Sequence, residues 1–197
     1  MTLPQGPRTP RRLADAHVEA LCDLDPIVAT SLGTRPGEDG LPDLGPEGIE
    51  AEAALLRATL ADLDRLLADD PSLAGDPVER RCARLLRERL GAELAAHEAG
   101  EGYRALSNLI SPMHSIRQVF SLMPMATDED WSVIARRLVR VPEAYRGYRA
   151  TLQEGVRRGL LVAPRQVHTV VGQLGEWLAA PYFGSFAQRM LSASLAR

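Results

Sequence analysis

Four polar side chains within one stretch of the chain have the types and spacing that ligand binding needs. They follow one another at intervals of three, one and three residues, which brings them onto one face of a helix, and they are His114, Arg117, Gln118 and Ser121. An arginine there can pair with a substrate carboxylate, and a histidine can donate or accept a hydrogen bond. We interpret the four residues as candidates for lining a substrate cleft. The alternative is that they form the solvent-exposed face of an amphipathic helix.

Metal chemistry has one weak candidate. The run from His97 to Glu101 matches the first two letters of the zincin signature HExxH, but Glu101 stands where the second zinc ligand is required. The other histidines, His17, His114 and His168, are dispersed, and the chain has neither a GxSxG elbow nor a P-loop. We therefore expect no catalytic residue, no metal ligand and no cofactor in this chain.

Composition limits the cellular setting and the partners. The 197 residues carry a net charge of −3, with an acidic excess up to Gly102 and an arginine excess after it. The arginines have neither aromatic stacking residues nor a helix-turn-helix pattern beside them, so we expect no nucleic acid partner. No apolar run approaches the ~20 residues of a membrane span. No apolar region follows Arg11-Arg12, so we expect neither a secretory nor a twin-arginine signal, and Cys22 and Cys82 are far apart. These features predict a cytoplasmic protein without a membrane partner.

The candidate residues lie on a well-delimited helix. Ser111 and Pro112 have the pattern of an N-cap followed by proline at the first helical position, and Pro124 ends the segment. Thr127 and Asp130 resemble a capping box that starts the next helix. An apolar stripe predicts that the opposite face packs into the core, and it consists of Met113, Ile116, Val119, Phe120 and Met123.

A long helical hairpin is predicted earlier in the chain. The first helix begins at Pro46 and has an apolar seam made of Ile49, Ala53, Leu56, Leu60, Leu63 and Leu67. The second begins at Asp76-Pro77, with the inward residues Val78, Cys82, Leu85, Leu86, Leu90 and Leu94. Because a short turn joins them, we expect the two helices to pack antiparallel.

The remaining segments also favour helices. Residues 1–10 have the composition of a disordered lead, a helix is expected from about Arg11, and the helix at Trp131 is expected to end near Pro142. Later helices use apolar faces made of Tyr145, Tyr148, Leu152 and Val156, and of Val167, Val170, Val171, Leu174 and Trp177. No segment alternates with a period of two residues. The sequence therefore predicts an all-α fold of seven to nine helices, with a single domain over residues 11–197.

Several segments together resemble the N-terminal part of actinobacterial members of the bacterial family called domain of unknown function 885. The resemblance covers about residues 12–177 and is carried by LDPIVATSLGT, LPDLGPEGIEA, LSNLISPMHSIRQVFSLMP, TDEDWSVIARRLVRVPEAYRGYRATLQEG and GLLVAPRQVHTVVGQLGEW. It implies a longer, zincin-like helical fold similar to carboxypeptidase Taq-type zinc peptidases. The HExxxGH-like zinc motif of that family lies downstream of the matched region, so the resemblance assigns no ligand to this chain.

Two hypotheses follow. The first is that the chain is the N-terminal part of a zinc metallopeptidase-like hydrolase, with the catalytic half missing; it would form one wall of the substrate cleft and be inactive alone. Apolar surface around Trp177, Phe183 and Phe186 would then be uncovered and would favour self-association. The second is a self-standing helical binding or regulatory module that could form a dimer.

Overall fold

The computed structural model describes residues 9–179 and Gly184, and this part of the chain is helical without a strand. The all-α class expected from the sequence is confirmed. In chain order the elements are α1 (Pro10–Leu24), α2 (Pro26–Leu32), α3 (Pro46–Asp69), the 3₁₀ helix η1 (Pro71–Ala74), α4 (Pro77–Glu98), the 3₁₀ helix η2 (Glu101–Arg104), α5 (Pro112–Leu122), α6 (Asp128–Arg157) and α7 (Pro164–Ala179). The expected lead up to residue 8, and Phe183 and Phe186, lie outside the described residues.

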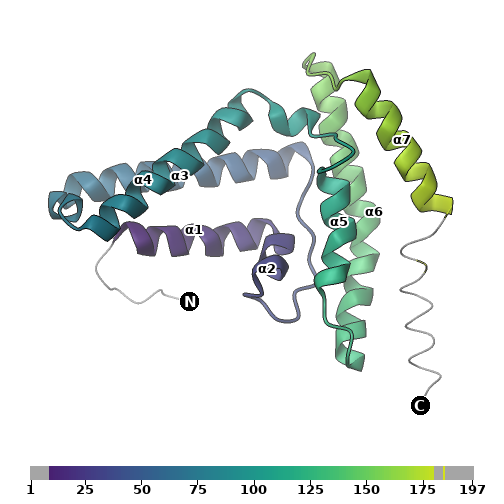
Figure 1. Ribbon diagram of the computed structural model, residues 1–197, viewed down its shortest axis with the longest axis horizontal. Coiled ribbons are helices and arrows are strands. Elements are labelled where there is room, and N and C mark those ends of the chain that lie inside the picture. Colours follow the sequence, from purple (N-terminus) through teal and green to yellow (C-terminus); the bar gives the residue numbers. More distant parts are fainter. Residues whose placement is uncertain (1–8, 180–183, 185–197) are drawn as a thin grey trace.

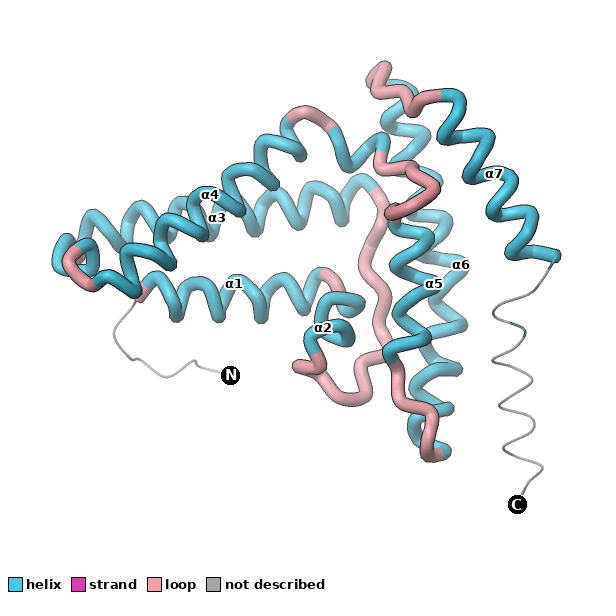
Figure 2. Tube along the Cα trace, in the orientation of Figure 1, coloured by secondary structure: helices cyan, strands magenta, loops and turns pink. Residues whose placement is uncertain are grey.

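The helices form two groups (Figure 1). Helices α3 and α4 lie side by side as the two arms of a hairpin joined through η1, and α1 packs against both of them. Helices α5 and α6 form the second group and run across the end of the first, while α7 lies on the outer side of α6. The loops that join the two groups are drawn in pink in Figure 2.

The inward face of α4 differs from the prediction. Val78 and Leu85 were expected in the hairpin seam, yet 52% and 47% of their surfaces are exposed. Of the predicted residues Leu90 is buried and Cys82, Leu86 and Leu94 are partly buried, while Glu79 and Ala83 are buried without having been predicted. The physical reason is that α4 packs against α1 as well as α3. Its Glu79 lies against α1.

The buried Glu79 is paired with an arginine of α1. Its Oε1 lies 2.6 Å from Arg11 Nε, and its Oε2 accepts a hydrogen bond from the Arg11 backbone N–H at 3.1 Å. Burial acts to raise the pKa of the Glu79 carboxyl, but the hydrogen bonds and charge of Arg11 outweigh burial and keep that pKa below its usual value. The carboxylate therefore ties the start of α1 to the start of α4.

Helix α6 continues through Pro142, which corrects the expectation that one helix ends there and another begins. A proline in a helix interior removes one backbone hydrogen bond and crowds the preceding turn, at a cost of ~3 kcal/mol. Here the flanking residues Val141 and Ala144 are buried in the main core, whereas Pro142 itself is exposed. Packing on both sides of the proline holds the two halves of α6 in one helix.

Close backbone approaches join α6 to the first group. Gly155 faces η2 so closely that a methyl group in place of its hydrogen would clash with the carbonyl oxygen of Tyr103. Gly147 faces the start of α3, where the same methyl group would lie 2.9 Å from the Gly45 nitrogen. Glycine at these two positions lets the long helix pack directly on backbone.

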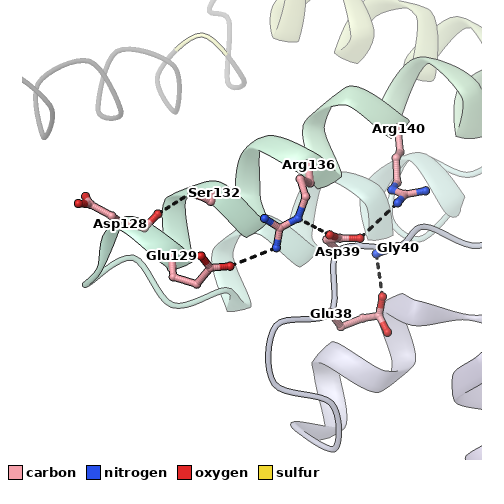
Figure 3. A network of polar contacts seen from close by, with 8 residues as sticks. All are labelled: Glu38, Asp39, Gly40, Asp128, Glu129, Ser132, Arg136 and Arg140. Atoms are coloured by element: carbon pink, nitrogen blue, oxygen red, sulfur yellow. Dashed lines mark hydrogen bonds and ion pairs between the residues drawn. The ribbon is translucent and has the colours of Figure 1, made fainter.

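Charge pairs connect the acidic first half of the chain to the arginine-rich second half (Figure 3). Asp39, in the loop after α2, accepts from Arg136 Nε at 2.6 Å and from Arg140 Nη2 at 3.4 Å, and both arginines belong to α6. Arg136 also contacts Glu129 of its own helix at 3.3 Å. The opposite signs of the two halves are thus used inside the molecule to hold this loop on α6.

Candidate functional site

Helix α5 begins at the predicted residue, but the side chain of Ser111 does not form the predicted N-cap hydrogen bond. Ser111 is the N-cap residue with an extended backbone and is followed by Pro112, yet its hydroxyl does not cap a backbone N–H. The Ser111 Oγ instead lies 2.8 Å from His114 Nδ1. The start of the helix therefore fixes the orientation of the imidazole.

The apolar face of α5 is a core anchor, as predicted. Met113, Ile116, Val119, Phe120 and Met123 are all at least 94% buried, and most of them belong to the main core cluster with α6. The capping box of Thr127 and Asp130 at the start of α6 is also present. Because this face is fixed, the opposite face of α5 has a defined direction.

The polar face of α5 divides into two pairs. Gln118 and Ser121 are exposed, while His114 and Arg117 are partly buried beneath α7. His114 Nε2 lies 3.2 Å from Gln173 Oε1, and its ring meets the Trp177 indole edge-on, with centroids 5.4 Å apart at 86°. The four predicted residues therefore share a helix face, and His114 and Arg117 both contact Trp177 of α7.

Arg117 contacts the same indole. Its guanidinium carbon lies 4.9 Å from the centroid of the Trp177 ring, within the range of a cation–π contact. Tyr145 of α6 is partly buried nearby; burial raises the pKa of its phenol, and the positive charge of Arg117 acts in the opposite direction. Arg117 thus lies among aromatic rings that come from two other helices.

Tyr148 closes the buried end of the cluster. It is 6% exposed, its hydroxyl donates to the Ala105 carbonyl at 2.7 Å, and burial raises its pKa to about 12. The phenol is therefore neutral at physiological pH and acts as a hydrogen-bond donor. Together with Met113 and Val170 it forms the second core cluster, which lies under α7.

We name His114, Arg117, Tyr145 and Trp177 the α5–α7 site. Its hydrogen bonds define the protonation pattern of the histidine. Because the Gln173 amide oxygen can only accept, His114 Nε2 carries a hydrogen, and neutral His114 accepts the Ser111 hydroxyl at Nδ1. Both ring nitrogens are therefore used inside the protein, and Ser111 is 4% exposed.

The sequence did not predict the contributions of α6 and α7 to this site. Tyr145 and Trp177 were recognised only as members of apolar helix faces, and Gln173 was not singled out. The spacing of Gln173 and Trp177, four residues apart, does place them on one face of α7. Which helix that face meets depends on the tertiary arrangement, which no local pattern encodes.

The region of the partial zincin motif has a structural contact. His97 Nε2 lies 3.4 Å from Glu50 Oε1 on α3, and Glu50 Oε1 also accepts from the Tyr103 hydroxyl at 3.2 Å. Helix α4 ends at Glu98, within the partial motif. Among the residues that the structure describes, no three His, Cys, Asp or Glu side chains gather as metal ligands would.

Two hollows in the described part of the chain lie away from the α5–α7 site. One, of ≈ 240 Å³, is formed by residues 41–44 and by Arg140, Glu143 and Ala144 of α6. The other, of ≈ 280 Å³, lies between Leu24 and the start of α3. Neither is lined by His114 or Arg117. These two side chains lie against Trp177 instead.

The described part of the chain is all-helical, and its α5–α7 site is covered by α7. The chain matches the model of the bacterial protein family of unknown function DUF885 over residues 26–196, and it belongs to that family. A search of curated proteins finds no match. Over residues 9–179, none of the helices is both long and apolar enough to cross a membrane.

Proposed function

We propose that this chain forms one wall of the substrate cleft in a zinc metallopeptidase-like hydrolase and is not catalytic on its own. The zinc and its ligands would be supplied by a separate C-terminal catalytic half. The observation that carries the proposal is the pairing of His114 and Arg117 on one face of α5, where an arginine lies among aromatic rings. An arginine in such a place can hold the carboxylate of a peptide or a related amide.

The chemistry of the cluster supports the assignment to one wall. In this structure both His114 nitrogens are engaged, by Ser111 and by Gln173, which supports a role of the histidine in binding and orientation. Arg117 keeps its positive charge at every physiological pH. Residues of this kind bind and orient a substrate, while bond cleavage requires a Lewis acid and an activated water from elsewhere.

The cellular setting is part of the proposal. We infer a cytoplasmic protein of the actinobacterial type, with neither nucleic acid nor membrane as partner. The free thiols of Cys22 and Cys82 support a reducing compartment.

Reconstitution tests the proposed function. The chain would be co-expressed with the zinc-binding half of a longer family member, and hydrolysis of N-acylated dipeptides would be measured for each half and for the pair. We expect a complex with one zinc, activity only in the pair, and none in this chain alone. Hydrolysis by this chain alone, or a stable zinc-loaded complex without hydrolysis, would contradict the proposal.

The alternative is a self-standing binding or regulatory module that could form a dimer. It is favoured by the outward side of α7, where Val171 and Leu178 are 63% and 82% exposed. Sedimentation velocity distinguishes the two functions. A dimer that Val171→Glu converts to a monomer, together with failure of the zinc-bearing half to bind, would favour the module.

A further inference from the structure

Helix α7 is attached to the rest of the protein by one face only. Of its 16 residues, Val170 alone is buried, and its polar contacts with other elements are made by side chains. Gln166 Oε1 accepts from the Asn108 N–H at 3.2 Å, and Gln173 Nε2 donates to the Asn108 carbonyl at 3.5 Å. A helix with so little buried area opens at a lower free energy than the core helices.

The connection to α7 has the properties of a hinge. Helix α6 ends at Arg157, Gly159 has a positive φ of 74°, and Leu160 is fixed by a hydrogen bond from its N–H to the Gly155 carbonyl at 2.9 Å. Residues 161–163, which follow, belong to no helix, and Leu161 is 63% exposed. Rotation about these residues moves α7 without disturbing the packing of Leu160.

Trp177 makes the contacts that a bound aromatic ring would make. Its face lies against the Arg117 guanidinium and its ring meets His114 edge-on, both on α5. If α7 swings away, this cationic and aromatic surface becomes available. We propose that α7 is a hinged cover, and that Trp177 occupies the place of an aromatic ring in a ligand that also carries a carboxylate.

This inference rests on the proposed function and names its substrate class. A guanidinium stacks on a ring with its flat face and hydrogen-bonds to a carboxylate with its edge, so Arg117 serves both parts of one ligand. His114 supplies a second ring for edge-to-face contact. The preferred substrate therefore has an aromatic side chain close to a carboxylate, as a peptide with a C-terminal aromatic residue does.

Tryptophan accessibility measures the displacement directly. The variant Trp131→Phe leaves Trp177 as the only tryptophan, and the probe ligand is N-acetyl-L-phenylalanine. We expect saturating ligand to raise acrylamide quenching of Trp177, whereas N-acetyl-L-alanine, which lacks the ring, has no effect. Quenching that stays unchanged or falls while N-acetyl-L-phenylalanine binds would overturn the proposal.

Calorimetry supplies the second measurement. Trp177→Ala removes the competing indole, so N-acetyl-L-phenylalanine should bind about tenfold more tightly than to the wild type, in line with the strength of a partly buried cation–π contact. The control Val171→Ala lies on the exposed side of the same helix and should leave affinity unchanged. Equal affinities of Trp177→Ala and wild type would refute the competition. Neither readout needs hydrolysis, so an inactive reconstituted enzyme would contradict the proposed function alone.

Discussion

The guanidinium of Arg117 on α5 lies 4.9 Å from the centroid of the Trp177 indole on α7. This contact joins α5, which has four buried residues, to α7, which has one. Arg117 was expected on a helix face turned either to a cleft or to solvent, and it is instead covered by an aromatic ring. The strength of this contact therefore sets how readily the α5–α7 site opens.

Hydrogen exchange should report that opening. Amides of α7 are expected to exchange faster than those of α5, because α5 has four buried residues in 11 and α7 has one in 16. Trp177→Ala should accelerate exchange in α7 by about tenfold, the equivalent of ~1.4 kcal/mol. Exchange in α5 should stay as in the wild type. Equal protection of both helices in the wild type would show that α7 is not a separate unit.

Gly155→Ala tests the close approach between α6 and η2. The added methyl group meets the backbone of Tyr103, which cannot move without shifting η2, so we expect a loss of about 1–3 kcal/mol in the free energy of unfolding. Urea denaturation followed by circular dichroism measures the change. Gly172→Ala is the matched control, because nothing lies within 4 Å of a methyl group there. A Gly155→Ala protein as stable as the wild type would mean that the two helical groups are not held at this contact.

The pH dependence of stability should reveal His17. This side chain is 8% exposed, contacts Thr59 Oγ1 at 2.9 Å, and has its pKa lowered by burial, with Glu93 acting in the opposite direction. The unfolded chain then binds a proton at His17 more readily than the folded chain. Stability is therefore lost as the pH falls through the ordinary value of 6.5 toward the lower folded pKa.

The comparison with His17→Gln isolates this contribution. Burial raises the pKa values of the Asp25 and Glu52 carboxyls, so these two groups act in the opposite direction at lower pH. From pH 7 to pH 5.5 the free energy of unfolding of the wild type should fall relative to that of His17→Gln. A difference that is constant over this range would contradict the lowered pKa of His17.

Metal analysis provides a prediction for the partial zincin motif. His97 contacts Glu50 and has no second histidine one turn away, so the purified chain should carry no stoichiometric zinc at neutral pH. His97→Ala should leave the metal content unchanged. One zinc per chain that is lost in this variant would assign the motif to metal binding.

Local features of the fold were predictable because they depend on neighbouring residues. The N-cap position of Ser111, the capping box of Thr127 and the buried stripe of α5 follow from side-chain types and helical spacing. Features that depend on a second helix were not predictable. Glu79 turns inward because Arg11 is there, and α6 continues past Pro142 because a core packs on both sides.

The candidate site also combines a feature that local sequence predicts with one that depends on another helix. Spacing alone placed His114 and Arg117 on one face of a helix, which the structure has. Trp177 belongs to the site because the chain reverses between Arg157 and Pro164, which brings α7 alongside α6 (Figure 1) and Trp177 against His114 and Arg117. No local pattern in 158–179 specifies that return. The aromatic partner of Arg117 therefore became visible only in three dimensions.

The most direct test of the central claim is the kcat/KM of Arg117→Ala in the reconstituted pair with the zinc-bearing half. The matched control is Arg149→Ala, an exposed arginine of α6 outside the α5–α7 site. We predict a drop of about 10- to 100-fold for Arg117→Ala with a C-terminal aromatic dipeptide, as expected for the loss of a charge-assisted hydrogen bond, and no change for Arg149→Ala. Equal kcat/KM values for wild type and Arg117→Ala would contradict the assignment of this face to the substrate cleft.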